Sequence, residues 1–333
     1  MLLVRNIRLP LSCPDPDAEA AAQALHILRV PAHKAARCGV AKLSVDARHG
    51  KPVLVYTMAI TLKDEGEESA YAGASPCVCF TQPARFSFSV GDTALKTRPV
   101  VVGLGPAGLF AALLLARSGF RPLVLERGPE LDERVKAVEH FEKTGELNLN
   151  ANIQFGEGGA GTFSDGKLTT RVGDPLCAFV TDAFLQHGAP ADIAWRQKPH
   201  VGTDLLRGII RSIRQEIIAL GGEVRFNTAL TGLKIENGAL ASVETTAGDF
   251  ACEQLILAVG HSARDTFAML HRQGMPLECK PFSVGFRAEH LQTEIDKSLY
   301  HAAAGHPVLP VGEYQLSQHV SGGRCVYTFC MCP

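Results

Sequence analysis

A glycine-rich turn near residue 100 constrains the fold of this chain more than any other feature. The run Pro99-Val-Val-Val-Gly-Leu-Gly-Pro-Ala-Gly108 places a buried strand before three glycines, and an amphipathic stretch then leads to a second apolar strand, Leu123-Val-Leu-Glu126. Gly103 permits a tight turn, Gly105 lets a pyrophosphate approach the backbone, and Gly108 lets the following helix pack against the strand. Strand, turn, helix, strand and acid thus follow in the order of a dinucleotide-binding βαβ unit.

The helix and the acid of this unit predict how a dinucleotide is held. The first helical turn, with Pro106 and Ala107, presents free N–H groups and a partial positive charge to phosphates. Glu126 follows at the spacing where a carboxylate accepts hydrogen bonds from both ribose hydroxyls of an adenosine, and Arg127 is next to it. The sequence therefore predicts a site for FAD or NAD(P).

A second glycine-rich stretch favours FAD. Residues 153–168, IQFGEGGAGTFSDGKL, hold five glycines between Gly156 and Gly166. Glycines weaken helices and central strands, so we expect a loop whose backbone approaches a ligand; a flexible surface loop is the alternative. A flavoprotein needs this second contact because the ribityl chain and isoalloxazine ring extend far from the adenine. The predicted contacts are Gly159, Gly161, Ser164, Asp165, Gly166 and Lys167.

A third motif, Gln254-Leu-Ile-Leu-Ala-Val-Gly260, is predicted to be a buried strand that ends in a glycine turn after a β-rich region. With the three motifs in this order, the chain resembles the glutathione-reductase-type flavoproteins with two dinucleotide-binding domains. More narrowly, it resembles bacterial FAD-dependent dehydrogenases or oxidoreductases that carry an extra N-terminal domain. The closer match is carried by residues 42–48, 155–168, 281–290 and 329–333. The resemblance implies non-covalent FAD, with Gly260 near the pyrophosphate.

Members of that group continue past the final Cys-Met-Cys-Pro sequence into more of a substrate domain. We therefore expect a C-terminally truncated chain of α/β class with three parts. Residues 1–95 form a small ferredoxin-like α+β domain, and residues 96–265 form a Rossmann-like FAD-binding domain with a β-meander and a glycine-rich insertion at 150–200. Residues 266–333 form an incomplete α+β substrate domain.

Local patterns predict the main elements of the first two parts. In the first part we expect strands at 2–8, 41–46 and 52–62, a helix at 17–28 and a loop or linker at 63–75. In the second part the apolar spacing predicts a helix at 204–220 and a third parallel strand at 223–226. A meander is expected at 230–235, 239–245 and 249–252, and the sheet resumes at 255–259.

Composition indicates a soluble, multidomain, cytoplasmic enzyme. The chain has 333 residues, 46% hydrophobic and 20% charged, with a net charge of −1, so it lacks the basic footprint of a nucleic-acid-binding protein. No apolar run reaches the length of a membrane span, and the N-terminus does not have the pattern of a signal peptide. The ten cysteines are expected to be reduced core residues, and none of their spacings predicts a metal site. Cys330 and Cys332 are alternative candidates for the substrate side of the flavin.

Catalytic side chains are predicted only in outline, because the isoalloxazine performs the electron chemistry. Lys167 is a candidate for stabilising the reduced, anionic ring, and His261 and His290 are candidate proton donors. The predicted function is an FAD-dependent oxidoreductase that acts on a small molecule, with NAD(P)H as a transient electron donor. One alternative is a tRNA-modifying flavoprotein, whose RNA would contact the basic residues Lys34, Arg37, Lys42, Arg48, His49 and Lys51. The other is a non-catalytic flavin-binding fragment.

Overall fold

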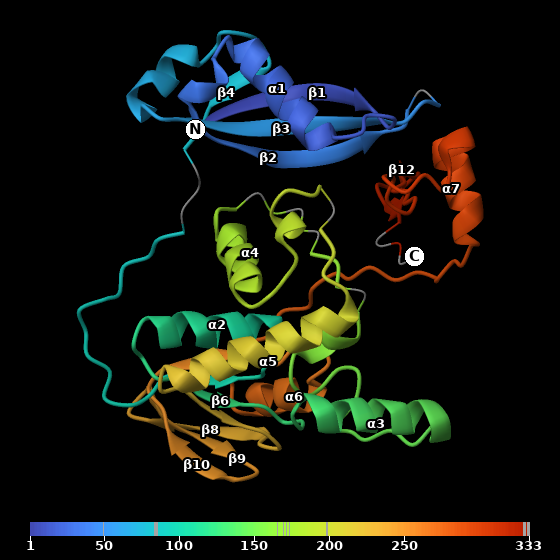
Figure 1. Ribbon diagram of the computed structural model, residues 1–333. Coiled ribbons are helices and arrows are strands. Elements are labelled where there is room, and N and C mark those ends of the chain that lie inside the picture. The colour runs from blue at the N-terminus through green and yellow to red at the C-terminus, as the bar shows by residue number, and fades with distance from the viewer. Residues whose placement is uncertain are drawn as a thin grey trace. The chain divides into compact units, whose positions relative to one another are not determined.

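The computed structural model describes the chain except residues 49, 83–85, 165, 169, 171, 173, 198, 329–330 and 332–333. Two compact units are present (Figure 1). The first unit comprises Met1–Ala84, Ala194–Pro199 and Phe282–Pro333, and the second comprises Arg85–Ile193 and His200–Pro281.

An antiparallel sheet forms the body of the first unit. Its strands are β1 (Leu2–Pro10), β2 (Ala35–Asp46), β3 (Val53–Leu62) and β4 (Val78–Phe80), in the order β2-β3-β1-β4. Alternate side chains of β3 are buried, and α1 (Pro16–Leu28) covers that face with Ala20, Ala24 and Leu28. The side chain of Asp15 caps α1 by accepting the N–H of Ala18 at 3.1 Å. This strand order is that of a ferredoxin-like sheet.

The segment expected to be a loop or linker at 63–75 is instead part of this sheet domain. It contains the 3₁₀ helix η2 (Glu65–Tyr71), and the buried carboxylate of Glu68 accepts the N–H of Leu62 at 2.9 Å. The edge strand β2 also begins earlier than predicted. Its pairing with β3 continues through two register shifts, so an arginine and a glycine in its first half are accommodated at the sheet edge.

A parallel sheet forms the centre of the second unit. Its strands are β5 (Val100–Val102), β6 (Leu123–Leu125), β7 (Glu223–Arg225) and β11 (Leu255–Leu257), in the order β11-β5-β6-β7. Every neighbouring pair is parallel. β5 and β6 are buried on both faces, which explains why their sequences are uninterrupted apolar runs.

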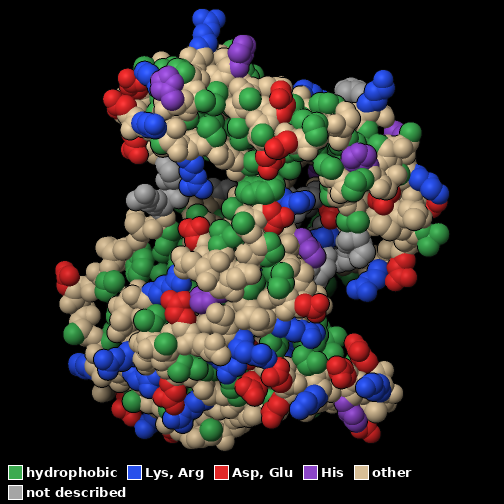
Figure 2. All heavy atoms as spheres, in the orientation of Figure 1, with side chains coloured by type: hydrophobic (Ala, Val, Ile, Leu, Met, Phe, Trp, Pro, Cys, Tyr) green, Lys and Arg blue, Asp and Glu red, His purple; other side chains and the backbone are tan. Residues whose placement is uncertain are grey.

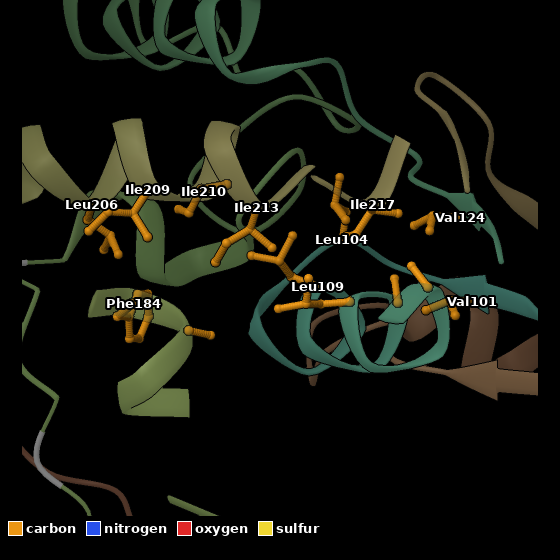
Figure 3. Close-up of a cluster of buried hydrophobic side chains, with 14 of the residues drawn as sticks. Val101, Leu104, Leu109, Val124, Phe184, Leu206, Ile209, Ile210, Ile213 and Ile217 are labelled. Carbon is orange, nitrogen blue, oxygen red and sulfur yellow. The ribbon is translucent and has the colours of Figure 1, made fainter. Parts of the chain in front are cut away.

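Helices cover one face of this sheet. The main ones are α2 (Pro106–Arg117) and α5 (Thr203–Ala219), and α4 (Leu176–Gln186) packs beside them. Figure 3 shows Ile213 and Ile217 of α5 close to Leu104 and Leu109, at the start of α2. The isoleucines of α5 recur at helical spacing, and this amphipathic pattern places the helix over the sheet.

A meander covers the opposite face with β8 (Leu230–Glu236), β9 (Ala239–Thr245) and β10 (Gly248–Ala251). The helix α6 (Arg264–Arg272) joins the same core through Met269 and Leu270. The second unit therefore continues to residue 281, beyond the expected boundary at 265. α6 was not expected because its apolar face is short and carries only a few large side chains.

The rest of the chain adds connections and a C-terminal segment. α3 (Leu131–Thr144) precedes the glycine-rich insertion, which contains the 3₁₀ helices η3 (Gly159–Phe163) and η4 (Ala191–Ala194) as well as α4. The C-terminal segment holds α7 (Gln292–Tyr300) and a hairpin of β12 (Ser317–His319) and β13 (Cys325–Tyr327). In the described part of the chain, no helix is long and apolar enough to cross a membrane.

Candidate functional site

A cavity of about 540 Å³ lies in the second unit at the carboxyl ends of three strands. Val102, Leu125 and Leu257, the last residues of β5, β6 and β11, line it. In open parallel sheets, ligands bind outside the carboxyl ends of the strands, at the point where the strand order reverses. The fold thus places the loops after these strands around a single hollow.

The first and third sequence motifs meet at the base of this cavity. Gly103 has a φ of +100°, and a side chain there would overlap the carbonyl oxygen of Ala258, just after β11. A side chain at Gly108 would overlap the carbonyl oxygen of Gly103. The Ala258 N–H donates to Val102 O at 2.8 Å, so the segments after β5 and β11 lie close together. The absence of side chains at Gly103 and Gly108 allows these segments and the helix α2 to pack this closely.

The second motif lies directly on the first. A Cβ at Gly159 would lie 2.8 Å from the Cα of Gly105, and the N–H of Gly158 donates to Leu104 O at 2.8 Å. Gly105 itself has ordinary backbone angles, and a Cβ there would meet only the Cα of Gly159, at 3.6 Å. The backbone geometry at position 105 therefore does not require a glycine. Gly105 and Gly159 both line the cavity.

Glu126, a residue that is only 4% exposed, joins these loops through its carboxylate. Oε2 accepts the N–H of Leu104 at 2.7 Å, and Oε1 accepts those of Gly128 and Gly156, each at 3.0 Å. A carboxylate has about four acceptor positions, so one remains beside the cavity that Glu126 lines. The predicted bond to a ribose hydroxyl stays a prediction, and the carboxylate has a second, structural task.

Arg127 lies on the cavity wall with Phe155. Its guanidinium carbon is 4.4 Å from the centre of the Phe155 ring, and Nη2 donates to Asp265 Oδ2 at 2.9 Å and Thr266 Oγ1 at 3.2 Å. Burial raises the pKa of the Asp265 carboxyl, but the hydrogen bonds from Arg127 and from backbone N–H groups, together with the charge of Arg127, outweigh burial, so the pKa is lowered. The arginine is thereby fixed in place by stacking on one side and by charge on the other.

The remaining predicted contacts fall into two groups. Pro106, Ala107, Gly161, Gly260 and His261 line the cavity. Ser164, Gly166 and Lys167 are not among its lining residues: Ser164 Oγ donates to Gly161 O at 2.7 Å, Gly166 packs on Gly202, and Lys167 forms a β-bridge with His200. Asp165 lies outside the described residues.

The two candidate proton donors have different surroundings. His261 Nε2 is 3.2 Å from Ser262 Oγ, next to the Gly260 turn. His290 belongs to the first unit, where its Nε2 is 2.7 Å from Tyr314 Oη. Of the two, only His261 is among the residues that line the cavity.

Sequence reasoning missed a buried arginine and the apolar wall of the cavity. Arg134 on α3 is 0% exposed and bonds to the glycine-rich loop. A signal for it exists, because Leu131, Arg134 and Val138 share one buried helical face. Part of this wall is formed by residues outside the three motifs: Thr228, Leu230, Phe267 and Leu270.

Some of the basic residues considered for RNA contact are paired with acids. Lys34 Nζ lies 3.2 Å from Glu67 Oε2, and Arg48 Nε lies 2.8 Å from Asp46 Oδ1, so two of the basic residues considered for RNA contact form ion pairs. His49, from the same set, lies outside the described residues. Figure 2 shows acidic and basic side chains interspersed on the face that carries α5.

Within the part of the chain that the structure describes, cysteines and metal-ligating residues form no second site. The eight cysteines of the described part of the chain are free thiols, and Cys330 and Cys332 lie outside it. Among the described residues, no group of three or more histidine, cysteine or acidic side chains could hold a metal ion.

Comparison with known proteins finds a matching family and a close relative in sequence. Residues 281–333 match the family described as "FAD-dependent protein, C-terminal domain-like". A protein of Clostridium beijerinckii, described as an uncharacterized protein, is 50% identical over 248 residues, which are 74% of this chain and 46% of that protein. This chain thus spans about half the length of the relative.

Two solved structures match about half of this chain at low identity. Glycine oxidase from Bacillus cereus is 12% identical, with a TM-score of 0.35, over 54% of this chain and 60% of that one. Thermovibrio ammonificans THI4 is 16% identical, with a TM-score of 0.36, over 54% of this chain and 62% of that one.

Proposed function

We propose that this chain is the FAD-binding part of an FAD-dependent oxidoreductase. The observation that carries the proposal is the convergence of Gly105, Gly159 and Glu126 on one cavity at the ends of parallel strands. A dinucleotide needs a stretch of backbone without side chains next to its pyrophosphate and a hydrogen-bond acceptor for its ribose hydroxyls, and these residues supply both. The family match at residues 281–333 supports FAD over NAD(P).

The start of α2 fits a pyrophosphate. The first hydrogen bond of the helix runs from Leu109 N to Gly105 O at 2.9 Å, so the N–H groups of Ala107 and Gly108 precede it. Pro106 at the first helical position has no N–H to satisfy. The free amides and the helix dipole favour an anion at this end of α2.

When bound, FAD would supply the two-electron transfer, and the chain would supply position and proton transfer. The remaining acceptor position of Glu126 would accept a hydrogen bond from a ribose hydroxyl. His261 is the proposed proton donor, because it borders the cavity. NAD(P)H is the proposed transient electron donor, and a small molecule is the proposed acceptor.

The proposal is tested by flavin binding to the purified protein. We expect added FAD to show a shifted and structured flavin absorbance on binding. Gly105→Ala should weaken FAD binding by roughly tenfold or more, about 1.4 kcal/mol, because a methyl group would occupy the space proposed for the pyrophosphate. Its thermal midpoint should stay close to that of the parent, since a Cβ at Gly105 meets the Cα of Gly159 at an ordinary 3.6 Å.

Gly208→Ala is the matched control. Gly208 lies within α5, and a Cβ there meets nothing within 4 Å, so FAD affinity should not change. Absence of FAD binding by the parent protein, or equal affinity of the parent and Gly105→Ala, would contradict the proposal. Preferential binding of NADH over FAD would assign the cavity to the other dinucleotide.

A further inference from the structure

We infer that Arg134 is a positioning residue that holds the glycine-rich loop in the shape that binds the cofactor. This inference rests on the proposed function, because the loop matters for a ligand only if the cavity binds one. Arg134 lies on α3, is fully buried, and is not among the residues that line the cavity. Any effect on a ligand must therefore pass through the loop.

The guanidinium is surrounded by oxygens of the loop. Nε donates to Asn152 O at 3.0 Å, and Nη2 donates to Ile153 O at 2.9 Å. Nη1 lies 2.5 Å from Glu157 O, 3.1 Å from Thr162 Oγ1 and 3.3 Å from Gly156 O. These five contacts span eleven residues of a segment that has few side chains able to pack, so one side chain fixes its course.

The opposite side of the same backbone is held by acceptors. Gly156 donates its N–H to Glu126 Oε1, and Gly158 donates to Leu104 O. The loop is therefore clamped between a cation at its carbonyls and a carboxylate at its amides. Gly156 has a φ of +115°, and a Cβ there would overlap the stem of Arg134, so these two residues are matched.

The site requires the shape of arginine as well as its charge. Burial lowers the pKa of Arg134 to about 10, so it remains protonated at neutral pH. Its hydrogen bonds in the described part of the chain all go to neutral oxygens. A planar fork with five N–H donors can serve oxygens in several directions, whereas an ammonium has three donors at one point. Lysine therefore cannot replace it.

Arg134→Lys and Arg134→Ala test this inference with two measurements. The first is hydrogen exchange of the peptide covering residues 150–163 in the cofactor-free protein, with the peptide covering α5 as an internal reference. The second is the dissociation constant of FAD. For Arg134→Lys we expect loop exchange to be faster and FAD binding weaker, each by roughly tenfold or more, with α5 exchange unchanged.

Chemical rescue distinguishes positioning from general damage to the fold. Millimolar guanidinium should restore slow loop exchange and FAD affinity to Arg134→Ala, whereas the same concentration of urea should not. Arg211→Ala is the control variant, because Arg211 is a partly exposed arginine of α5 that pairs with Asp132 of α3 at 2.6 Å. Neither measurement should change in this variant.

Three results would overturn the inference. These are slow loop exchange in Arg134→Lys, fast loop exchange with unchanged FAD affinity, and failure of guanidinium to restore Arg134→Ala. The exchange arm needs no cofactor. If the parent protein does not bind FAD, the proposed function fails, and loop exchange still decides whether Arg134 holds the loop.

Discussion

Glu126→Gln removes a charge at the point where three loops meet, and its cost can be worked out from the contacts. An amide has one acceptor oxygen, so it can keep the bonds to Gly128 and Gly156 only if its NH₂ group faces the N–H of Leu104. Leu104 is 0% exposed, so its N–H finds no water in place of the lost partner.

A buried N–H without a partner costs about 1–3 kcal/mol, and hydrogen bonds to a charged acceptor are roughly 1 kcal/mol stronger than those to a neutral one. Part of this loss is offset because the carboxylate no longer has to be desolvated. We therefore expect Glu126→Gln to lower the free energy of unfolding by about 2–4 kcal/mol. FAD affinity should fall as well, by about 1.5–3 kcal/mol, because the charged ribose acceptor is lost.

Urea denaturation followed by far-ultraviolet circular dichroism measures the first effect in the cofactor-free protein at neutral pH. Glu236→Gln is the control, since Glu236 is an exposed carboxylate at the end of β8 that pairs with Lys234 and should change stability by less than about 0.5 kcal/mol. If the two variants are equally stable, Glu126 does not hold the loops together. If stability falls but FAD affinity does not, its role is structural alone.

Three further changes test the fold around the cavity. Gly103→Ala should destabilise by more than about 1 kcal/mol in a thermal scan, because φ is +100° and the methyl group would meet Ala258 O; an unchanged midpoint would contradict this. Leu113→Ala should lower the free energy of unfolding in urea by about 2–5 kcal/mol, because Leu113 lies on the buried face of α2 and is 0% exposed. The hydrogen bond from Arg117 lowers the pKa of Glu216 below its ordinary 4.5, so this carboxylate stabilises the fold above that pH and the effect is lost as pH falls through the lowered pKa. Urea midpoints of Glu216→Gln should therefore depend less on acid pH than those of the parent.

The central βαβ unit could be predicted because each of its parts has a local cause. The apolar run of β5 must be buried on both faces, Gly103 and Gly108 must be glycine for close packing, and the isoleucine spacing of α5 defines an apolar face. These signals lie within a few residues of the structure they specify. The ends of two strands were predicted less well: β7 and β11 are each three residues long and end earlier than the strands expected at 223–226 and 255–259.

The glycine-rich loop shows why part of the site could not be predicted. Its composition disfavours an α-helix and a central strand, but glycine permits so many conformations that the sequence does not select one. The selection comes from Arg134 and Glu126, which are distant in the chain and contact the loop from opposite sides. Ser164, Gly166 and Lys167 belong to the same motif but do not line the cavity: Ser164 bonds to Gly161 within the motif, and Gly166 and Lys167 contact Gly202 and His200.

The hydrogen bonds of Arg134 and Glu126 to the glycine-rich loop affect ligand binding in a way that the glycines alone would not. A free glycine-rich loop loses much conformational entropy when it closes on a ligand, and that loss weakens the complex. Here Arg134 and Glu126 order the loop during folding, since both sets of hydrogen bonds are internal to the protein. The cost of ordering is therefore met by the stability of the second unit, and the cavity is formed before a ligand arrives. Variants of Arg134 should accordingly weaken the binding of a ligand that the Arg134 side chain does not touch.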